Sequence, residues 1–145
     1  MAATQEPSFT VLIAEDDDGH ADLVVEQLQE AGLRCPIRRF RDGQEVLDFL
    51  HPAGGGGWDQ PCVLLLDINM PRLDGIAVLK RLKGDPGTRS IPVIMLTTTD
   101  DPVEVAACYR LGCNLYITKP VEFAAFAETL DRLGRFLQVL QVARP

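Results

Sequence analysis

Five polar residues, each placed where a hydrophobic segment ends, could together perform phosphoryl chemistry. They are Glu15, Asp16, Asp67, Thr97 and Lys119. Three carboxylates brought close together repel one another unless a cation compensates them, and oxygen ligands are those that Mg²⁺ prefers. A lysine ammonium and a hydroxyl add donors for phosphate oxygens. The set predicts Mg²⁺-dependent transfer of a phosphoryl group to a carboxylate, which gives an aspartyl phosphate.

Strands and helices must alternate to bring these residues together. The apolar runs predict strands over residues 9–14, 37–40, 63–67, 91–97 and 114–118. Helical patterns follow each of them, over about 20–31, around 46–50, over 76–83, from 102, and over 122–142. We expect an α/β fold with a five-stranded parallel sheet in the order 2-1-3-4-5, a flavodoxin-like, doubly wound (βα)5 arrangement. In this order the first and third strands adjoin, so the acids would meet at the carboxyl edge.

Size and charge narrow the classes of protein. With 145 residues, 46% of them hydrophobic, the chain predicts one domain over 1–145, with 1–8 as a loose leader. The formal charge of −7 and the lack of a basic run argue against nucleic-acid binding. No signal peptide and no apolar run of about 20 residues is present, so we expect a cytoplasmic protein outside the membrane. The four scattered cysteines are expected to be reduced and mostly buried.

Several polar residues have ordinary structural interpretations. Asp17 and Asp18 are expected to cap a helix or to favour its dipole, and Asp74 and Asp101 to cap two later helices. The glycine run at 54–57 lacks the Gly-Lys-Ser/Thr of a phosphate loop and predicts a flexible loop. His20 is expected to be an exposed helix residue without a partner in the site.

The last helix carries an apolar repeat at alternating intervals of three and four residues. The repeat consists of Phe123, Phe126, Leu130, Leu133, Leu137 and Leu140. A helix over 122–142 would be longer than a five-residue strand and would overhang the sheet. We therefore predict a homodimer through Phe136, Leu137 and Leu140. The alternative is simple core packing with a frayed tail.

Four segments of the sequence are similar to those of a known family. VLIAEDD, LLLDINMPRLDG, PVIMLTTTD and LYITKP resemble, in this order and spacing, the receiver domain of two-component response regulators over residues 10–141. The long loop before LLLD and the segment from Lys83 to Asp100 resemble single-domain receivers paired with phytochrome-type histidine kinases. The resemblance implies a response regulator without an output domain, whose partner is a sensor histidine kinase such as a bacteriophytochrome.

The resemblance also implies a role for each site residue. Asp67 would accept the phosphoryl group from a kinase phosphohistidine. Asp16 would bind Mg²⁺ directly, Glu15 through water, and Asn69 through its backbone carbonyl. The Glu-Asp pair departs from the Asp-Asp pair of many receivers, which makes Glu15 a longer and looser partner.

Further implied roles concern the phosphoryl oxygens and signalling. Lys119 and Thr97 would hold these oxygens, with a cis bond between Lys119 and Pro120. Thr97 and Tyr116 would form the switch that changes the surface of the fourth helix, fifth strand and fifth helix. Asn69 and Thr99 would tune the lifetime of the phosphate.

Two other functions share some of these residues. A phosphatase of the haloacid dehalogenase type also forms an aspartyl phosphate with Mg²⁺, but it needs a second acid two residues later, where this chain has Asn69. A pseudo-receiver used only for docking would not need the complete set of acids with Thr97 and Lys119. We expect a phosphoacceptor that catalyses only its own phosphorylation and dephosphorylation, not an enzyme.

Overall fold

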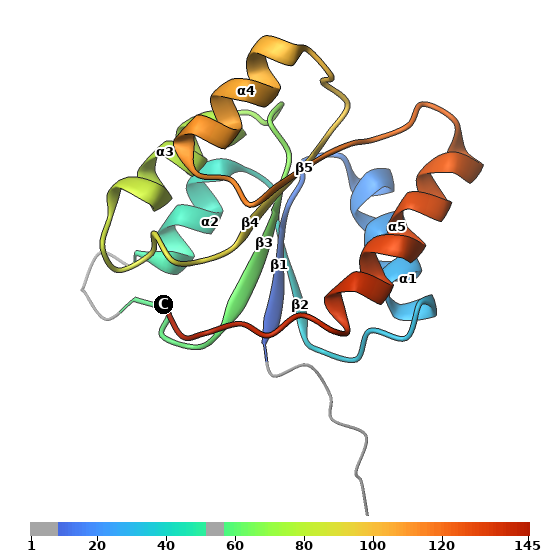
Figure 1. The fold of residues 1–145 in the computed structure, drawn as a ribbon, viewed down its shortest axis with the longest axis horizontal. Helices are drawn as coiled ribbons and strands as arrows, with labels where there is room; N and C mark the ends of the chain where they lie inside the picture. The colour runs from blue at the N-terminus through green and yellow to red at the C-terminus, as the bar shows by residue number, and fades with distance from the viewer. Residues whose placement is uncertain (1–8, 52–56) are drawn as a thin grey trace, which may run out of the picture.

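A single parallel sheet forms the centre of the protein (Figure 1). The computed structural model describes residues 9–51 and 57–145. Its strands are β1 (Thr10–Ala14), β2 (Ile37–Phe40), β3 (Cys62–Leu66), β4 (Val93–Thr97) and β5 (Leu115–Thr118). They pair in the order β2-β1-β3-β4-β5, all parallel. The predicted fold class and strand order are confirmed.

Helices cover both faces of this sheet. On one face lie α2 (Gly43–Leu50), α3 (Gly75–Gly84) and α4 (Pro102–Leu111); on the other lie α1 (Asp18–Glu30) and α5 (Phe123–Leu137) (Figure 1). Side chains of the central strands alternate between two cores: Leu12 and Leu64 face the first layer of helices, whereas Val11 and Val63 face the second. Burial on both sides explains why β3 reads as an unbroken apolar run.

Aspartates begin the helices as expected. Side-chain oxygens of Asp17, Asp74 and Asp101 accept hydrogen bonds from backbone N–H groups in the first turns of α1, α3 and α4. Pro102 occupies the start of α4, where its missing N–H costs nothing. Gly32, with φ of 105°, lies just beyond α1 in the left-handed conformation that glycine favours. The predicted caps of α1, α3 and α4 and the predicted end of α1 at Gly32 are thus confirmed.

The predicted C-terminal end of the last helix is wrong. Helix α5 ends at Leu137 rather than at residue 142. Gln138, which follows it, donates a hydrogen bond to the backbone carbonyl of Ala31, so the chain turns across the end of α1 instead of continuing past the sheet. Leu140, in the irregular segment beyond, packs partly against the same core.

Leu137 is also wrong as a dimer-interface residue. Its side chain has no exposed surface, and it belongs to the core between α1, α5 and the sheet. Most of the repeat serves this core, because Phe126, Leu130 and Leu133 are buried with it. The close approach of the helices explains the tight packing: a Cβ atom at Gly134 would lie 2.7 Å from the Cβ of Ala31.

Some expectations concern residues outside the described part. The leader at 1–8 and most of the glycine run at 54–57 lie there; Gly57, which is described, adopts no regular structure. In the described ranges, no helix is both long enough and apolar enough to cross a membrane. All four cysteines are free and buried, as expected.

Candidate functional site

Backbone hydrogen bonds align the strand ends that carry the polar residues. The N–H of Asp67 donates to the carbonyl of Ala14 at 3.1 Å, and the N–H of Glu15 donates to Phe40 at 3.0 Å. The N–H of Lys119 donates to the carbonyl of Thr97 at 2.6 Å. The hydrogen-bonding of the sheet thus continues just past the last residue of each strand. It fixes the backbone positions from which these polar side chains extend.

The structure brings the three acids together at the junction of β1 and β3. One carboxylate oxygen each from Glu15, Asp16 and Asp67 lies within 4.8 Å of the others. Glu15 and Asp67 are 3% and 7% exposed, whereas Asp16 is exposed to solvent. Two acids therefore form the floor of the site, and the third lies at its opening.

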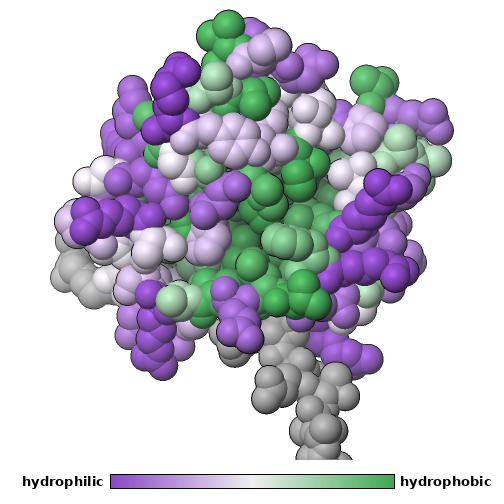
Figure 2. All heavy atoms as spheres, in the orientation of Figure 1, coloured by the Kyte–Doolittle hydropathy of each residue, from purple (hydrophilic) through white to green (hydrophobic). Residues whose placement is uncertain are grey.

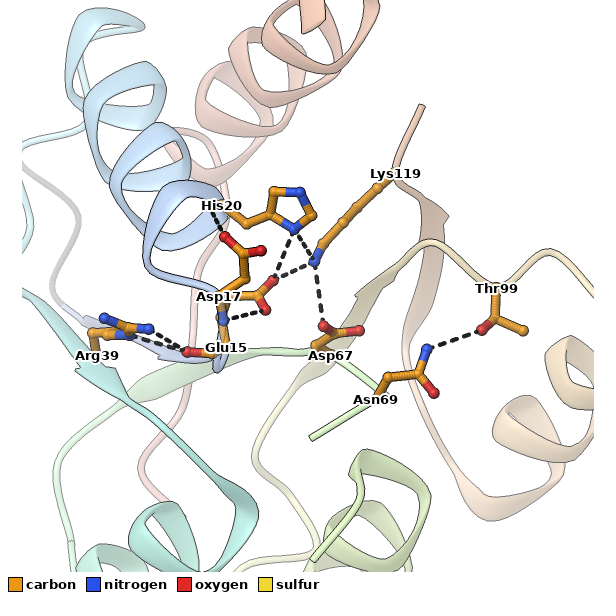
Figure 3. A network of polar contacts seen from close by, with 8 residues as sticks. All are labelled: Glu15, Asp17, His20, Arg39, Asp67, Asn69, Thr99 and Lys119. Atoms are coloured by element: carbon orange, nitrogen blue, oxygen red, sulfur yellow. Dashed lines mark hydrogen bonds and ion pairs between the residues drawn. The ribbon is translucent and has the colours of Figure 1, made fainter. Parts of the chain in front are cut away.

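Lys119 compensates the two buried acids. Its Nζ forms an ion pair with Glu15 Oε1 and lies 3.3 Å from Asp67 Oδ2 (Figure 3). Burial raises the pKa of Glu15 to about 7, although the Lys119 ammonium acts in the opposite direction. Without a further cation, one ammonium thus compensates two carboxylates, and the site favours additional positive charge.

Two buried oxygen atoms in the site lack a hydrogen-bond partner among the described residues. They are Asp67 Oδ1 and Thr97 Oγ1. Buried polar atoms of this kind are rare and call for an explanation such as a bound ion or ligand. A cation that binds Asp67 and a phosphoryl oxygen that accepts from Thr97 would satisfy both. The all-oxygen ligand set therefore fits a hard divalent cation.

A glycine keeps the backbone close behind Asp67. A Cβ atom at Gly75 would lie 2.1 Å from the carbonyl oxygen of Asp67, and the N–H of Gly75 donates to Ile68 at 2.8 Å. The loop between β3 and α3 can fold back in this way only with glycine at that position. Asn69 lies in this loop, exposed, with its amide nitrogen 3.5 Å from Thr99 Oγ1 (Figure 3).

Tyr116 lies at the edge of the site rather than in it. Its hydroxyl donates a 2.6 Å hydrogen bond to the backbone carbonyl of Thr99, in the loop that follows β4. Burial raises the pKa of the phenol to about 12, which keeps this donor protonated. The side chain thus connects β5 to the loop next to Thr97.

The expected cis bond before Pro120 is wrong. Among the described residues no peptide bond is cis, so Lys119 and Pro120 are joined in the trans form. The trans form is the intrinsically favoured one for a bond to proline. Lys119 reaches both buried acids from this backbone.

His20 is a site residue that the sequence did not reveal. Its Nδ1 lies 3.2 Å from Lys119 Nζ and 3.8 Å from Glu15 Oε1 (Figure 3). The expectation that it lacks a partner in the site is therefore wrong. Its place in the first turn of α1, four residues after Asp16, is the signal that could have found it.

Arg39 is a second residue that was missed. Its Nε and Nη2 donate to the carbonyl oxygen of Glu15 at 3.0 and 2.8 Å (Figure 3). Its Nη1 donates to Asp18 at 2.6 Å. Arg39 pairs with Ile13 in the register of β2 and β1. The signal in the sequence is a basic residue on β2, the strand next to the acidic loop that follows β1.

The profile of the response regulator receiver domain matches residues 11–131. The chain belongs to this family. In sequence, the response regulator Rcp1 of Synechocystis is 34% identical over 120 residues, which cover 82% of each chain. A receiver domain of Rhodospirillum rubrum has a similar structure, with a TM-score of 0.88 and 43% identity over 92% of this chain and 96% of that one.

Two further solved structures bear on the site. The Mn²⁺-bound form of Rcp1 has a TM-score of 0.83 and 27% identity, and it covers 93% of this chain and 99% of its own. The phosphorylated cyanobacterial phytochrome response regulator RcpA has a TM-score of 0.80 and 27% identity, covering 92% of this chain and 97% of its own. The receiver is thus a phosphoacceptor signalling module, and the alternative of a haloacid dehalogenase-type phosphatase is wrong.

Proposed function

We propose that Asp67 accepts a phosphoryl group from the phosphohistidine of a sensor kinase, in a reaction that requires Mg²⁺. The observation that carries this proposal is Asp67 itself: a buried carboxylate with one oxygen paired to Lys119 and the other without a partner among the described residues. In the transfer, an Asp67 oxygen bonds to phosphorus as the P–N bond of the phosphohistidine breaks. The leaving imidazole retains the electron pair of that bond and takes up a proton.

Three residues beside Asp67 would hold the cation. Asp16, which is exposed at the opening, would bind it directly, the buried Glu15 would act through water, and Asn69 would contribute its backbone carbonyl. When bound, Mg²⁺ supplies positive charge that reduces the repulsion between the acids and the incoming phosphoryl group. The position of an exposed acid beside two buried ones supports this division of roles.

Lys119 and Thr97 would hold the phosphoryl oxygens. Lys119 already reaches Asp67, and the hydroxyl of Thr97 is buried and has no partner in the described structure. Both would donate to oxygens on which negative charge increases during transfer, which is how such sites speed the reaction. Because these residues belong to the protein and not to the kinase, we propose that the receiver catalyses its own phosphorylation and dephosphorylation.

Thr97 and Tyr116 would transmit the signal. Thr97 moves toward the phosphoryl group, and the loop after β4 moves with it. Tyr116 is bonded to Thr99 in that loop, so its side chain would lose or change this contact and turn inward. The hydrogen bond between Tyr116 and the loop supports a switch in which the Tyr116 side chain has two alternative positions.

The partner would be a sensor histidine kinase of the phytochrome type. Similarity to Rcp1 and to the phytochrome response regulator RcpA supports this assignment. A cytoplasmic location would suit the four buried free thiols, because that compartment keeps cysteines reduced.

A homodimer through α5 and β5 is also proposed. Apolar surface lies between α4 and α5 (Figure 2), and Leu115, Ile117, Leu133 and Phe136 line a shallow pocket there. Phe136 is 42% exposed, which supports its predicted place in the interface, and Leu140 packs partly against the core. Along α5 the acids Glu128 and Asp131 each precede their arginine partners, Arg132 and Arg135, by four residues, so a second copy of the helix packed antiparallel would place acids opposite arginines.

The phosphoacceptor proposal is tested by intact mass spectrometry after incubation with phosphoramidate and Mg²⁺. One labile phosphoryl adduct is expected on the wild-type protein, and none on Asp67→Asn or in the presence of EDTA. The exposed Asp59→Asn is the matched control and should retain the adduct. An adduct on Asp67→Asn would contradict the assignment.

A further inference from the structure

His20 contacts the lysine of the site from a different element. Helix α1 carries the imidazole, whereas Lys119 follows β5, and the two meet above Asp67 (Figure 3). Nδ1 of His20 lies 3.2 Å from Nζ of Lys119. An ammonium group has donors only, so Lys119 donates and the lone pair of Nδ1 accepts. His20 is thus the one uncharged acceptor among the three described contacts of this ammonium.

Two contacts place His20. Its backbone N–H donates at 2.9 Å to the side chain of Asp17, the residue that caps α1. Its ring meets the buried ring of Phe126 edge to face, with centroids 5.7 Å apart. The acceptor is therefore placed by the capped start of α1 and by an aromatic contact with the core.

We propose that His20 is a positioning residue that holds the Lys119 ammonium over Asp67 during phosphoryl transfer. In the structure Lys119 divides its donors among Glu15, Asp67 and His20. The inference rests on the proposed function, in which a cation draws on both carboxylates. Their attraction for Lys119 then weakens, and the neutral acceptor on His20 keeps Nζ directed at the phosphoryl oxygen.

Two substitutions separate the acceptor of His20 from its ring. His20→Phe keeps the aromatic contact with Phe126 and removes the acceptor. His20→Asn removes the ring and keeps an acceptor oxygen near the place of Nδ1. Both are measured beside the wild-type protein with phosphoramidate at saturating Mg²⁺.

The proposal predicts that His20→Phe slows phosphorylation about fivefold, as expected for one lost hydrogen bond, whereas His20→Asn stays within about twofold of wild type. The proposal would be overturned if phosphorylation were slowed in His20→Asn alone, in both variants, or in neither variant. His51→Phe, which alters the other histidine at the end of α2, is the control and should retain the wild-type rate.

A second measurement reports on the contact itself. In protein labelled with ¹⁵N-lysine, the Nζ resonance of Lys119 should shift in His20→Phe and much less in His20→Asn. An unchanged resonance in His20→Phe would overturn the proposal. Failure of the proposed function is seen separately, because it would place the adduct on a residue other than Asp67 in the wild-type protein.

Discussion

The carboxylate of Glu15 lies in an environment very different from water. It is 3% exposed and paired with Lys119, and burial still raises its pKa to about 7. A buried acid therefore retains its proton in the folded metal-free protein at a pH where the unfolded chain has lost it. This arrangement is unfavourable without a cation and suits a site that binds one.

The raised pKa of Glu15 makes stability depend on pH when EDTA is present. The folded-state pKa of about 7 exceeds the ordinary value of 4.5, so this residue's contribution is complete below pH 4.5 and is lost as the pH rises through about 7. Relative to Glu15→Gln, the wild-type free energy of unfolding should fall by on the order of 2 kcal/mol over that interval. Urea unfolding of both proteins across the interval measures it, and parallel pH profiles would contradict it.

The loop between β1 and α1 is the element that presents the acids, and its support comes from β2. Arg39 donates twice to the Glu15 carbonyl and once to Asp18, so one guanidinium joins β2, the end of β1 and the start of α1. Substituting a group that orients a metal ligand commonly lowers the metal affinity about 10- to 100-fold. Strand pairing alone would leave the direction of this loop less defined.

Removing that support should weaken cation binding. Arg39→Ala is expected to lower Mg²⁺ affinity about tenfold, measured by calorimetry. Arg41→Ala is the matched control, because Arg41 contacts Asp18 but not the Glu15 carbonyl. Equal affinity in the two variants would show that the contact with Glu15 does not position the loop.

Much of this element structure was predictable. The apolar runs of β3 and β4 and the aspartate caps have direct local causes, so strand order and helix starts followed from the sequence. The end of α5 did not, because an apolar residue such as Leu140 packs on the core equally well from an irregular segment. His20 was missed since it lies beside the buried stripe of α1, and only the tertiary arrangement brings Lys119 to it.

At the scale of the whole molecule, α5 has two sides with different tasks. Leu137 is fully buried against α1 and the sheet, whereas its neighbour Phe136 is 42% exposed beside the pocket over β5. The first side holds the domain together, and the second is available to a partner. Of these two adjacent residues, Leu137 therefore serves the stability of the domain, and Phe136 is available for the proposed assembly.

Two substitutions distinguish these tasks. Leu137→Ala should lower the free energy of unfolding by about 2–5 kcal/mol, because it leaves a cavity in the core. Phe136→Ala should lower it by less than about 1 kcal/mol, yet it should weaken the proposed dimer in sedimentation velocity. A wild-type protein that is monomeric at tens of micromolar, with and without phosphodonor, would remove the dimer proposal.

The most direct test of the site is a crystal structure of the protein with Mg²⁺ and beryllium trifluoride, a mimic of the phosphoryl group. We predict beryllium on Asp67, the cation against Asp16 and Asp67, and the fluorides hydrogen-bonded to Lys119 and Thr97. A cation bound away from these acids, or a Thr97 hydroxyl that stays without a partner, would contradict it.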